Sequence, residues 1–147
     1  MIIIKDGNIL DAKESIVVHQ VNVDGVMGGG VARQLANRYP GLEIKYNLYC
    51  QENNYDYSKL KGKVFNARVK DKAIMNIFSQ KPNFDTDYES MKQCFKCVKT
   101  YAKLTKKSVC MPYKIGCGIA NGDWKKVYRI IKDVFSDYDV TLYRLEK

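Results

Sequence analysis

The chain has 147 residues, 46% of them hydrophobic, and this length and composition fit about one domain with a buried core and exclude a disordered protein. Its longest apolar runs are far shorter than the roughly 20 residues that cross a bilayer, and its start lacks the pattern of a secretory signal, so we expect a cytoplasmic protein with no membrane partner. The formal net charge of +9 attracts anions without choosing among them.

Six apolar runs rich in β-branched and aromatic residues predict six strands. They lie at Met1–Ile4, Ser15–Asn22, Lys63–Val69, Ala73–Phe78, Ser108–Met111 and Asp139–Leu145. Helical patterns fall between most of these runs, and strands that alternate with helices form a mostly parallel sheet covered on both faces. We therefore expect a three-layer α/β/α fold with a mixed, mostly parallel sheet of about six strands, in one domain over residues 1–147.

Two helical patterns follow the second strand. The first covers residues 31–39, after a run of glycines, and the second covers residues 42–50. The second repeats apolar side chains at Ile44, Leu48 and Tyr49, which predicts that these residues face the core.

Two more helices are predicted in the second half of the chain. Thr86 is a candidate N-cap for the first of them, with Glu89 as its capping-box partner. One face of this helix is apolar, at Tyr88, Met91, Phe95, Val98 and Ala102. The second helix runs from Trp124 to Phe135, and its buried residues are expected to be Val127, Ile130, Ile131 and Val134.

Two glycine-rich segments follow strand-like runs and open onto helices. They read HQVNVDGVMGGGVARQL at 19–35 and CMPYKIGCGIANGDWKKV at 110–127. Glycine allows backbone N–H groups to turn outward, and a helix N-terminus adds partial positive charge, so each segment can hold a phosphate. Two such segments at the carboxyl ends of strands favour a diphosphate ligand, although each alone is equally explained as a tight turn. Neither matches the P-loop or the dinucleotide G-x-G-x-x-G pattern.

The cysteines and the single histidine do not form a metal-binding pattern. An odd number of cysteines in a chain with no export signal favours reduced thiols. The five are Cys50, Cys94, Cys97, Cys110 and Cys117. Only one C-x-x-C is present and His19 is the only histidine, so we expect no metal site and no cofactor. His19 lies in an apolar strand, which is more typical of a satisfied buried histidine than of a base.

At the glycine-rich segments the chain resembles the macrodomain family of ADP-ribose-binding α/β/α modules. The segments that show the resemblance are HQVNVDGVMGGGVARQLANRYP, MPYKIGCGIANGDW and the N-terminal strand leading into KDGNIL. The branch it resembles most includes single-domain ADP-ribose protein glycohydrolases and ADP-ribose-1″-phosphate phosphatases. The resemblance runs from Ile2 to Leu145 and implies that ADP-ribose, free or attached to a macromolecule, is the ligand.

The resemblance also implies roles for individual residues. Asn8, followed by Ile9, takes the place of an aspartate that accepts a hydrogen bond from the adenine amino group. Asn22 is the residue expected to contact the distal ribose directly. The diphosphate and ribose would be wrapped by Met27, Gly28, Gly29, Gly30 and Val31. The second segment would close from the other side through Ile115, Gly116, Cys117, Gly118, Ile119 and Ala120. Met27 and Ile119 are equally explained as core residues.

Two departures from the glycohydrolase branch affect the predicted chemistry. That branch uses a lysine that attacks the distal ribose and an aspartate that acts as acid and base, and Gln80 and Ala120 fall at those positions here. Lys81 is one position away, and a slip of one residue in a strand turns a side chain to the other face. The polar residues left to position a water are Asn22, Asp24, Gln80 and Asp123.

Two of the polar residues near the second segment have alternative explanations. Asp123 precedes a predicted helix and is equally a helix N-cap. Cys117 could be an activated thiol, but no partner base is evident, which favours a small loop residue.

These observations support a hydrolase that removes phosphate or an ADP-ribosyl linkage from the distal ribose, and we expect a monomer. The alternative is a reader module that binds ADP-ribose without turnover. Direct nucleic-acid binding is a third possibility that is not favoured, because it leaves both glycine segments unexplained and because the lysines are spread over several runs. Those runs are at Lys59–Lys63, Lys103–Lys107 and Lys125–Lys126.

Overall fold

The computed structural model describes residues 1–145, which form six strands and six helical segments. The strands are β1 (Ile2–Asp6), β2 (Ile16–Val21), β3 (Val64–Val69), β4 (Lys72–Phe78), β5 (Val109–Pro112) and β6 (Val140–Arg144). The helices are the 3₁₀ turn η1 (Ile9–Asp11), α1 (Gly30–Arg38), α2 (Leu42–Glu52), α3 (Tyr57–Leu60), α4 (Tyr88–Thr105) and α5 (Trp124–Val134). The six predicted strands and four predicted helices are all present, and the short η1 and α3 were not predicted.

The strands form one mixed sheet in the order β1-β6-β5-β2-β4-β3. Every neighbouring pair is parallel except β3 and β4, which are joined by a tight turn and run antiparallel. This arrangement confirms the prediction of a mostly parallel sheet of about six strands. It also places the carboxyl ends of the central strands β2, β4 and β5 at one edge of the sheet.

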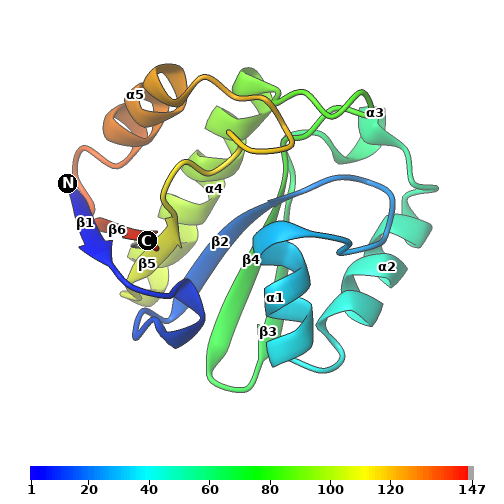
Figure 1. The fold of residues 1–147 in the computed structure, drawn as a ribbon, viewed down its shortest axis with the longest axis horizontal. Coiled ribbons are helices and arrows are strands. Elements are labelled where there is room, and N and C mark those ends of the chain that lie inside the picture. The colour runs from blue at the N-terminus through cyan, green and yellow to red at the C-terminus, as the bar shows by residue number, and fades with distance from the viewer. Residues whose placement is uncertain (146–147) are drawn as a thin grey trace.

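Helices cover both faces of the sheet, as the three-layer prediction requires (Figure 1). Alternate residues of β2 point to opposite faces, so Val17 and Val21 join a core with α1 and α2, whereas Ile16 and Val18 join a core with α4 and α5. Both cores are composed of side chains removed almost completely from water, and this burial is the main source of stability.

Two local predictions are wrong, and both errors have a physical cause. Helix α4 is capped by Asp87, whose carboxylate accepts from the N–H of Ser90 at 3.2 Å, and not by Thr86. Thr86 is buried, and its hydroxyl donates to the carbonyl of Gly116 in the second glycine segment instead of capping the helix. In α2, Ile44 and Leu48 are exposed, since the face turned to the sheet bears Leu42, Tyr46 and Cys50.

The predicted core face of α5 is also not uniform. Val127, Ile131 and Val134 are buried as expected, but Ile130 is only partly buried.

Within residues 1–145 no helix has the length and apolar character needed to cross a membrane.

Candidate functional site

A cavity of about 650 Å³ lies at the carboxyl ends of β2, β4 and β5, between the two glycine segments. Its size is within the range of small-molecule sites, and its position is where open α/β sheets bind ligands. Most of its lining comes from the two predicted segments: Asn22, Asp24, Met27, Gly28, Gly29, Gly30, Val31, Ile115, Gly116, Gly118, Ile119 and Ala120. Gln80 lines it from the loop after β4.

The first glycine segment presents a row of unpaired backbone donors. Within residues 1–145, no acceptor is found for the N–H groups of residues 28–32, and the N-cap residue Gly29 has no side chain to satisfy them. Gly29 itself has extended backbone, and a Cβ built there would meet nothing within 4 Å. Because helix α1 begins here, its dipole adds to the attraction for an anion.

The second glycine segment presents a similar set of donors from the opposite side. The N–H groups of residues 118–120 have no acceptor in the described part of the chain. The loop is fixed internally, because Gly122 N–H donates to the carbonyl of Gly116 at 2.8 Å. It is fixed externally by Thr86, whose hydroxyl donates to the same carbonyl at 2.7 Å and whose N–H donates to Ala120 at 2.8 Å. Two loops with free N–H groups can therefore hold two anionic groups.

Hydrogen bonds fix the orientation of the Asn22 side chain. Its Oδ1 accepts from the N–H of Asp24 at 3.0 Å. The hydroxyl of Tyr46, which has one proton to donate, lies 2.5 Å from the backbone carbonyl oxygen of Asn22 and 2.9 Å from its Oδ1. Tyr46 is fully buried in α2, and burial raises the pKa of its hydroxyl, which stays protonated and able to donate. With the oxygen of Asn22 engaged, its amide N–H₂ is left to donate to an acceptor in the cavity.

His19 is buried at 1% exposure and also lines the cavity. Its Nε2 is 2.6 Å from Oδ1 of Asn76, and Asn76 donates its own amide to the carbonyls of Phe65 and Ile74. Nε2 is therefore the protonated nitrogen, and Nδ1 is buried with no partner in the described residues. Burial lowers the pKa of His19 to about 4, so the ring is neutral at pH 7. The prediction that His19 is a buried histidine with its hydrogen bonds made is therefore confirmed for Nε2 and wrong for Nδ1.

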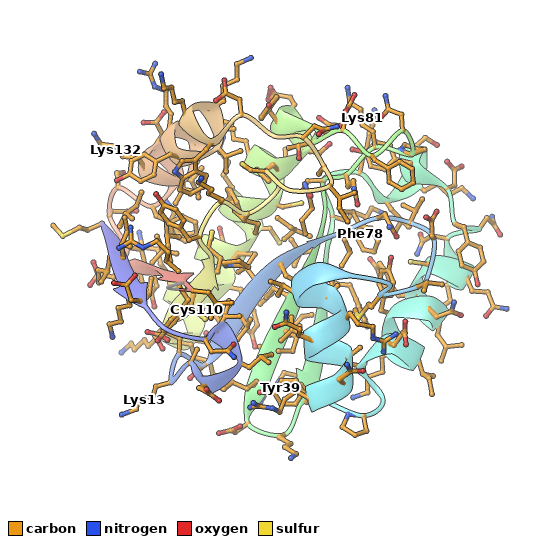
Figure 2. All side chains as sticks on the ribbon, in the orientation of Figure 1. Lys13, Tyr39, Phe78, Lys81, Cys110 and Lys132 are labelled. Carbon is orange, nitrogen blue, oxygen red and sulfur yellow. The ribbon has the colours of Figure 1, made fainter. Side chains whose placement is uncertain are left out.

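The loop after β4 brings Gln80, and not Lys81, to the cavity. The chain leaves β4 at Phe78, and Gln80 is 8% exposed with Nε2 3.4 Å from the carbonyl of Phe84. Lys81 does not line the cavity, and Figure 2 shows it at the outer surface of the molecule. Phe84 was not predicted, yet it lines the cavity rim with φ at +72°.

Four of the predicted site residues do not line the cavity. Asn8 caps η1 by accepting from Leu10 N–H at 3.0 Å, and Ile9 is buried beside it, so their role at the adenine stays a prediction. Asp123 is the N-cap of α5 and accepts from Lys125 N–H at 3.0 Å. Burial raises the pKa of the Cys117 thiol, which disfavours the thiolate that an activated nucleophile requires.

Sequence reasoning missed residues on other elements that line the cavity beside the predicted ones, among them Tyr46 and Phe84. Tyr46 carried a signal that could have identified it, because it is one turn from Leu42 and Cys50 on an apolar helix face. Phe84 carried none, because its loop has no periodic pattern.

Comparison with known proteins gives a consistent family match. The model of the Macro domain family matches residues 18–131. A protein of Lodderomyces elongisporus named ADP-ribose 1″-phosphate phosphatase is 26% identical over 91% of this chain and 89% of its own length. A Bos taurus protein named ADP-ribose glycohydrolase OARD1 is 26% identical over 88% of this chain and 81% of its own length. The macrodomain of Mycobacterium tuberculosis DarG has the same fold, with a TM-score of 0.84, 24% identity and coverage of 100% of this chain and 99% of its own.

Proposed function

The chain belongs to the Macro domain family, and from this premise we propose that it binds ADP-ribose in the cavity and hydrolyses a group from the distal ribose. The observation that supports binding most directly is the facing pair of loops with unpaired N–H groups, at residues 28–32 and 118–120. Such loops match the two phosphates of a diphosphate, and the two curated relatives bear names of ADP-ribose hydrolases.

Three polar side chains could take part in hydrolysis. Among residues 1–145, Asp24 is the only carboxylate in the lining of the cavity, so it is the candidate general base that takes a proton from an attacking water. Asn22 donates through its amide to a ribose oxygen, and Gln80 can orient the water. In this scheme the water oxygen forms a bond to C1″ of the distal ribose or to the phosphorus of its phosphate. The bond from that atom to the leaving oxygen breaks, and the leaving group departs with the bonding electrons.

A second function, ADP-ribose binding without turnover, is favoured by one specific observation. The two positions that supply lysine and aspartate in the glycohydrolase branch are occupied by Gln80 and Ala120, and neither can attack or transfer a proton. Release of product from ADP-ribose-1″-phosphate and from glutamate-linked ADP-ribosylated protein separates the two functions. Phosphate or ADP-ribose release supports the hydrolase, and its absence together with tight binding supports the reader.

Free ADP-ribose is expected to bind and to raise the melting temperature. A ligand that binds only the native state stabilises it by about 2.7 kcal/mol at a concentration one hundred times its Kd. Calorimetry and thermal melts with ADP-ribose measure this effect, and AMP, which lacks the second phosphate and the distal ribose, should bind more weakly. The absence of both heat and thermal shift at millimolar ADP-ribose would rule out the proposal.

Asn22→Ala is expected to weaken ADP-ribose binding or turnover by roughly 1 kcal/mol or more, because one hydrogen bond to the ribose is lost. Lys81→Ala is the matched control, since Lys81 is exposed and does not line the cavity, and it should change turnover little. Borohydride reduction should trap no ADP-ribosyl adduct on Lys81. Loss of activity in Lys81→Ala, or a trapped adduct, would restore a lysine mechanism.

A further inference from the structure

A single lysine lines the cavity between the two glycine segments, and sequence reasoning did not identify it. Lys114 is the only Lys or Arg among the described residues of the lining, and Asp24 is the only carboxylate. His19 also lines the cavity, but its ring is neutral at pH 7. All of the formal positive charge in the lining therefore comes from Lys114.

The charge of Lys114 is available to a ligand. Its side chain is exposed and forms no salt bridge with any described residue. By contrast, Arg33 in the first glycine segment is paired with Glu43 at 3.2 Å. Burial and the Asp123 carboxylate raise the pKa of the Cys117 thiol, whereas the Lys114 ammonium group opposes both effects. The field of Lys114 therefore acts on the second glycine segment.

The backbone at Lys114 has a conformation that a lysine adopts only at a cost. The N–H of Ile115 donates to the carbonyl of Pro112 at 3.1 Å, which closes a turn over residues 112–115. Lys114 is the third residue of this turn and has a φ of +62°. Turns with a positive φ at this place usually have glycine or asparagine there, because a Cβ crowds the neighbouring carbonyl. A lysine here indicates that its side chain contributes something that glycine would not.

The turn is continuous with the donors of the second glycine segment, in the loop that joins β5 to α5 (Figure 1). The carbonyl of Lys114 accepts from the N–H of Cys117 at 3.0 Å, and the free N–H groups of residues 118–120 follow directly. Backbone N–H groups have only partial positive charge. An ammonium group beside them can add a charge-assisted hydrogen bond to the same anion.

We propose that the Lys114 ammonium group donates to the diphosphate of the ligand, and that the backbone strain at this position is retained because it holds that charge at the cavity. The inference rests on the function proposed above, which places a diphosphate between the two loops. It makes Lys114 a determinant of affinity for anionic ligands, while the free N–H groups position the phosphates. Stability and binding therefore favour different residues at this position.

Three substitutions separate the charge of Lys114 from its backbone strain. Lys114→Gly removes both, Lys114→Gln removes only the charge, and Lys114→Arg keeps both. In calorimetry at about 25 mM salt, the Gly and Gln variants should bind ADP-ribose at least about threefold more weakly than the unmodified protein, and the difference should fall below about twofold at about 0.5 M salt, because salt screens an exposed charge. Lys114→Arg should stay within about twofold at both salt concentrations.

Thermal melts measure the strain. Lys114→Gly should have a melting temperature equal to or above that of the unmodified protein, because glycine adopts a positive φ without the crowding of a Cβ. Lys114→Gln should melt at the same temperature as the unmodified protein. A lower melting temperature of Lys114→Gly would show that the turn needs the lysine for its own structure, and would overturn the inference.

Lys106→Gly is the matched control. Lys106 is also an exposed lysine with positive φ, at +56°, but it caps helix α4 and does not line the cavity. Its replacement removes the same charge and the same kind of strain. The melting temperature should therefore change in the same direction as in Lys114→Gly, while the affinity for ADP-ribose should change less than about twofold.

Inorganic pyrophosphate is a second probe, because it contains the diphosphate without the nucleoside or the distal ribose. In NMR titrations it should shift the backbone amides of residues 28–32 and 118–120, and Lys114→Gln should require a higher concentration. If pyrophosphate behaves in this way and ADP-ribose does not bind, the proposed function fails and the role of Lys114 toward a diphosphate holds. Unchanged affinity of Lys114→Gln for both probes, an equal loss in Lys106→Gly, or no binding of either probe would overturn the inference.

Discussion

Acidification from pH 7 to pH 5 is expected to lower the free energy of unfolding by roughly 2 kcal/mol through His19 alone. In the unfolded chain this side chain has its ordinary pKa of 6.5, and in the folded protein burial lowers the pKa to about 4. Between these two values the unfolded state binds a proton that the folded state does not. The full stability is present above pH 6.5 and is lost progressively toward pH 4, at about 1.4 kcal/mol per pH unit.

Because His19 is the only histidine, its contribution can be measured without interference. Urea unfolding at pH 7, 6 and 5 should show the decline in the unmodified protein and a nearly flat profile in His19→Gln, whose amide can still donate to Asn76. The ring resonances of His19 in NMR spectra should not shift between pH 7 and pH 5. A resonance that titrates near pH 6.5, or equal pH slopes in both proteins, would contradict the buried, neutral state.

Gly122→Ala is expected to displace the second glycine segment and to abolish most ADP-ribose binding. A Cβ at this position would lie 2.4 Å from the carbonyl oxygen of Gly116 and 3.3 Å from Oγ1 of Thr86. The first contact is with the backbone of the same loop, so it cannot be relieved by a change of rotamer. Overpacking of this kind costs about 1–3 kcal/mol, and it separates the hydrogen-bonded pair that positions the free N–H groups.

Gly118→Ala is the control for the stability of the loop, because a Cβ at Gly118 would meet no protein atom within 4 Å. Thermal melts should show a lower melting temperature for Gly122→Ala and little change for Gly118→Ala. Calorimetry should show that Gly122→Ala has lost most of its affinity for ADP-ribose. Normal ADP-ribose affinity in Gly122→Ala would show that the geometry of this loop is not required for binding.

The sequence predicted the strands well because their apolar runs are long enough to indicate a strand and no other element. The run at 73–78 is fully buried in β4, and a strand covered on both faces is apolar at nearly every position. Its one polar residue, Asn76, is hydrogen-bonded to His19 and to two backbone carbonyls.

Helix α2 shows the limit of this reasoning. Its apolar residues lie on more than one face, and the sequence pattern predicts Ile44 and Leu48 in the core. In the structure Tyr46 is buried there, stacked on Phe78 of β4.

The cap of α4 shows a second limit. Both Thr86 and Asp87 are suitable N-cap residues, and local sequence does not distinguish them. The choice is made by the second glycine segment, which is distant in sequence and uses the Thr86 hydroxyl to fix the carbonyl of Gly116. A residue with a partner far along the chain is not available for a local role.

The sequence by itself determined the fold class and the two loops that line the cavity, because strand patterns and glycine runs are local and have few structural solutions. Only the tertiary structure decided which polar groups are free to act. The hydroxyl of Tyr46 contacts the backbone and side-chain oxygens of Asn22 and leaves its amide N–H₂ for a ligand, and Asn76 engages one nitrogen of His19 and leaves the other unpaired. These outcomes depend on hydrogen bonds between residues far apart in sequence, and a buried polar group acquires its partner only when the chain has folded.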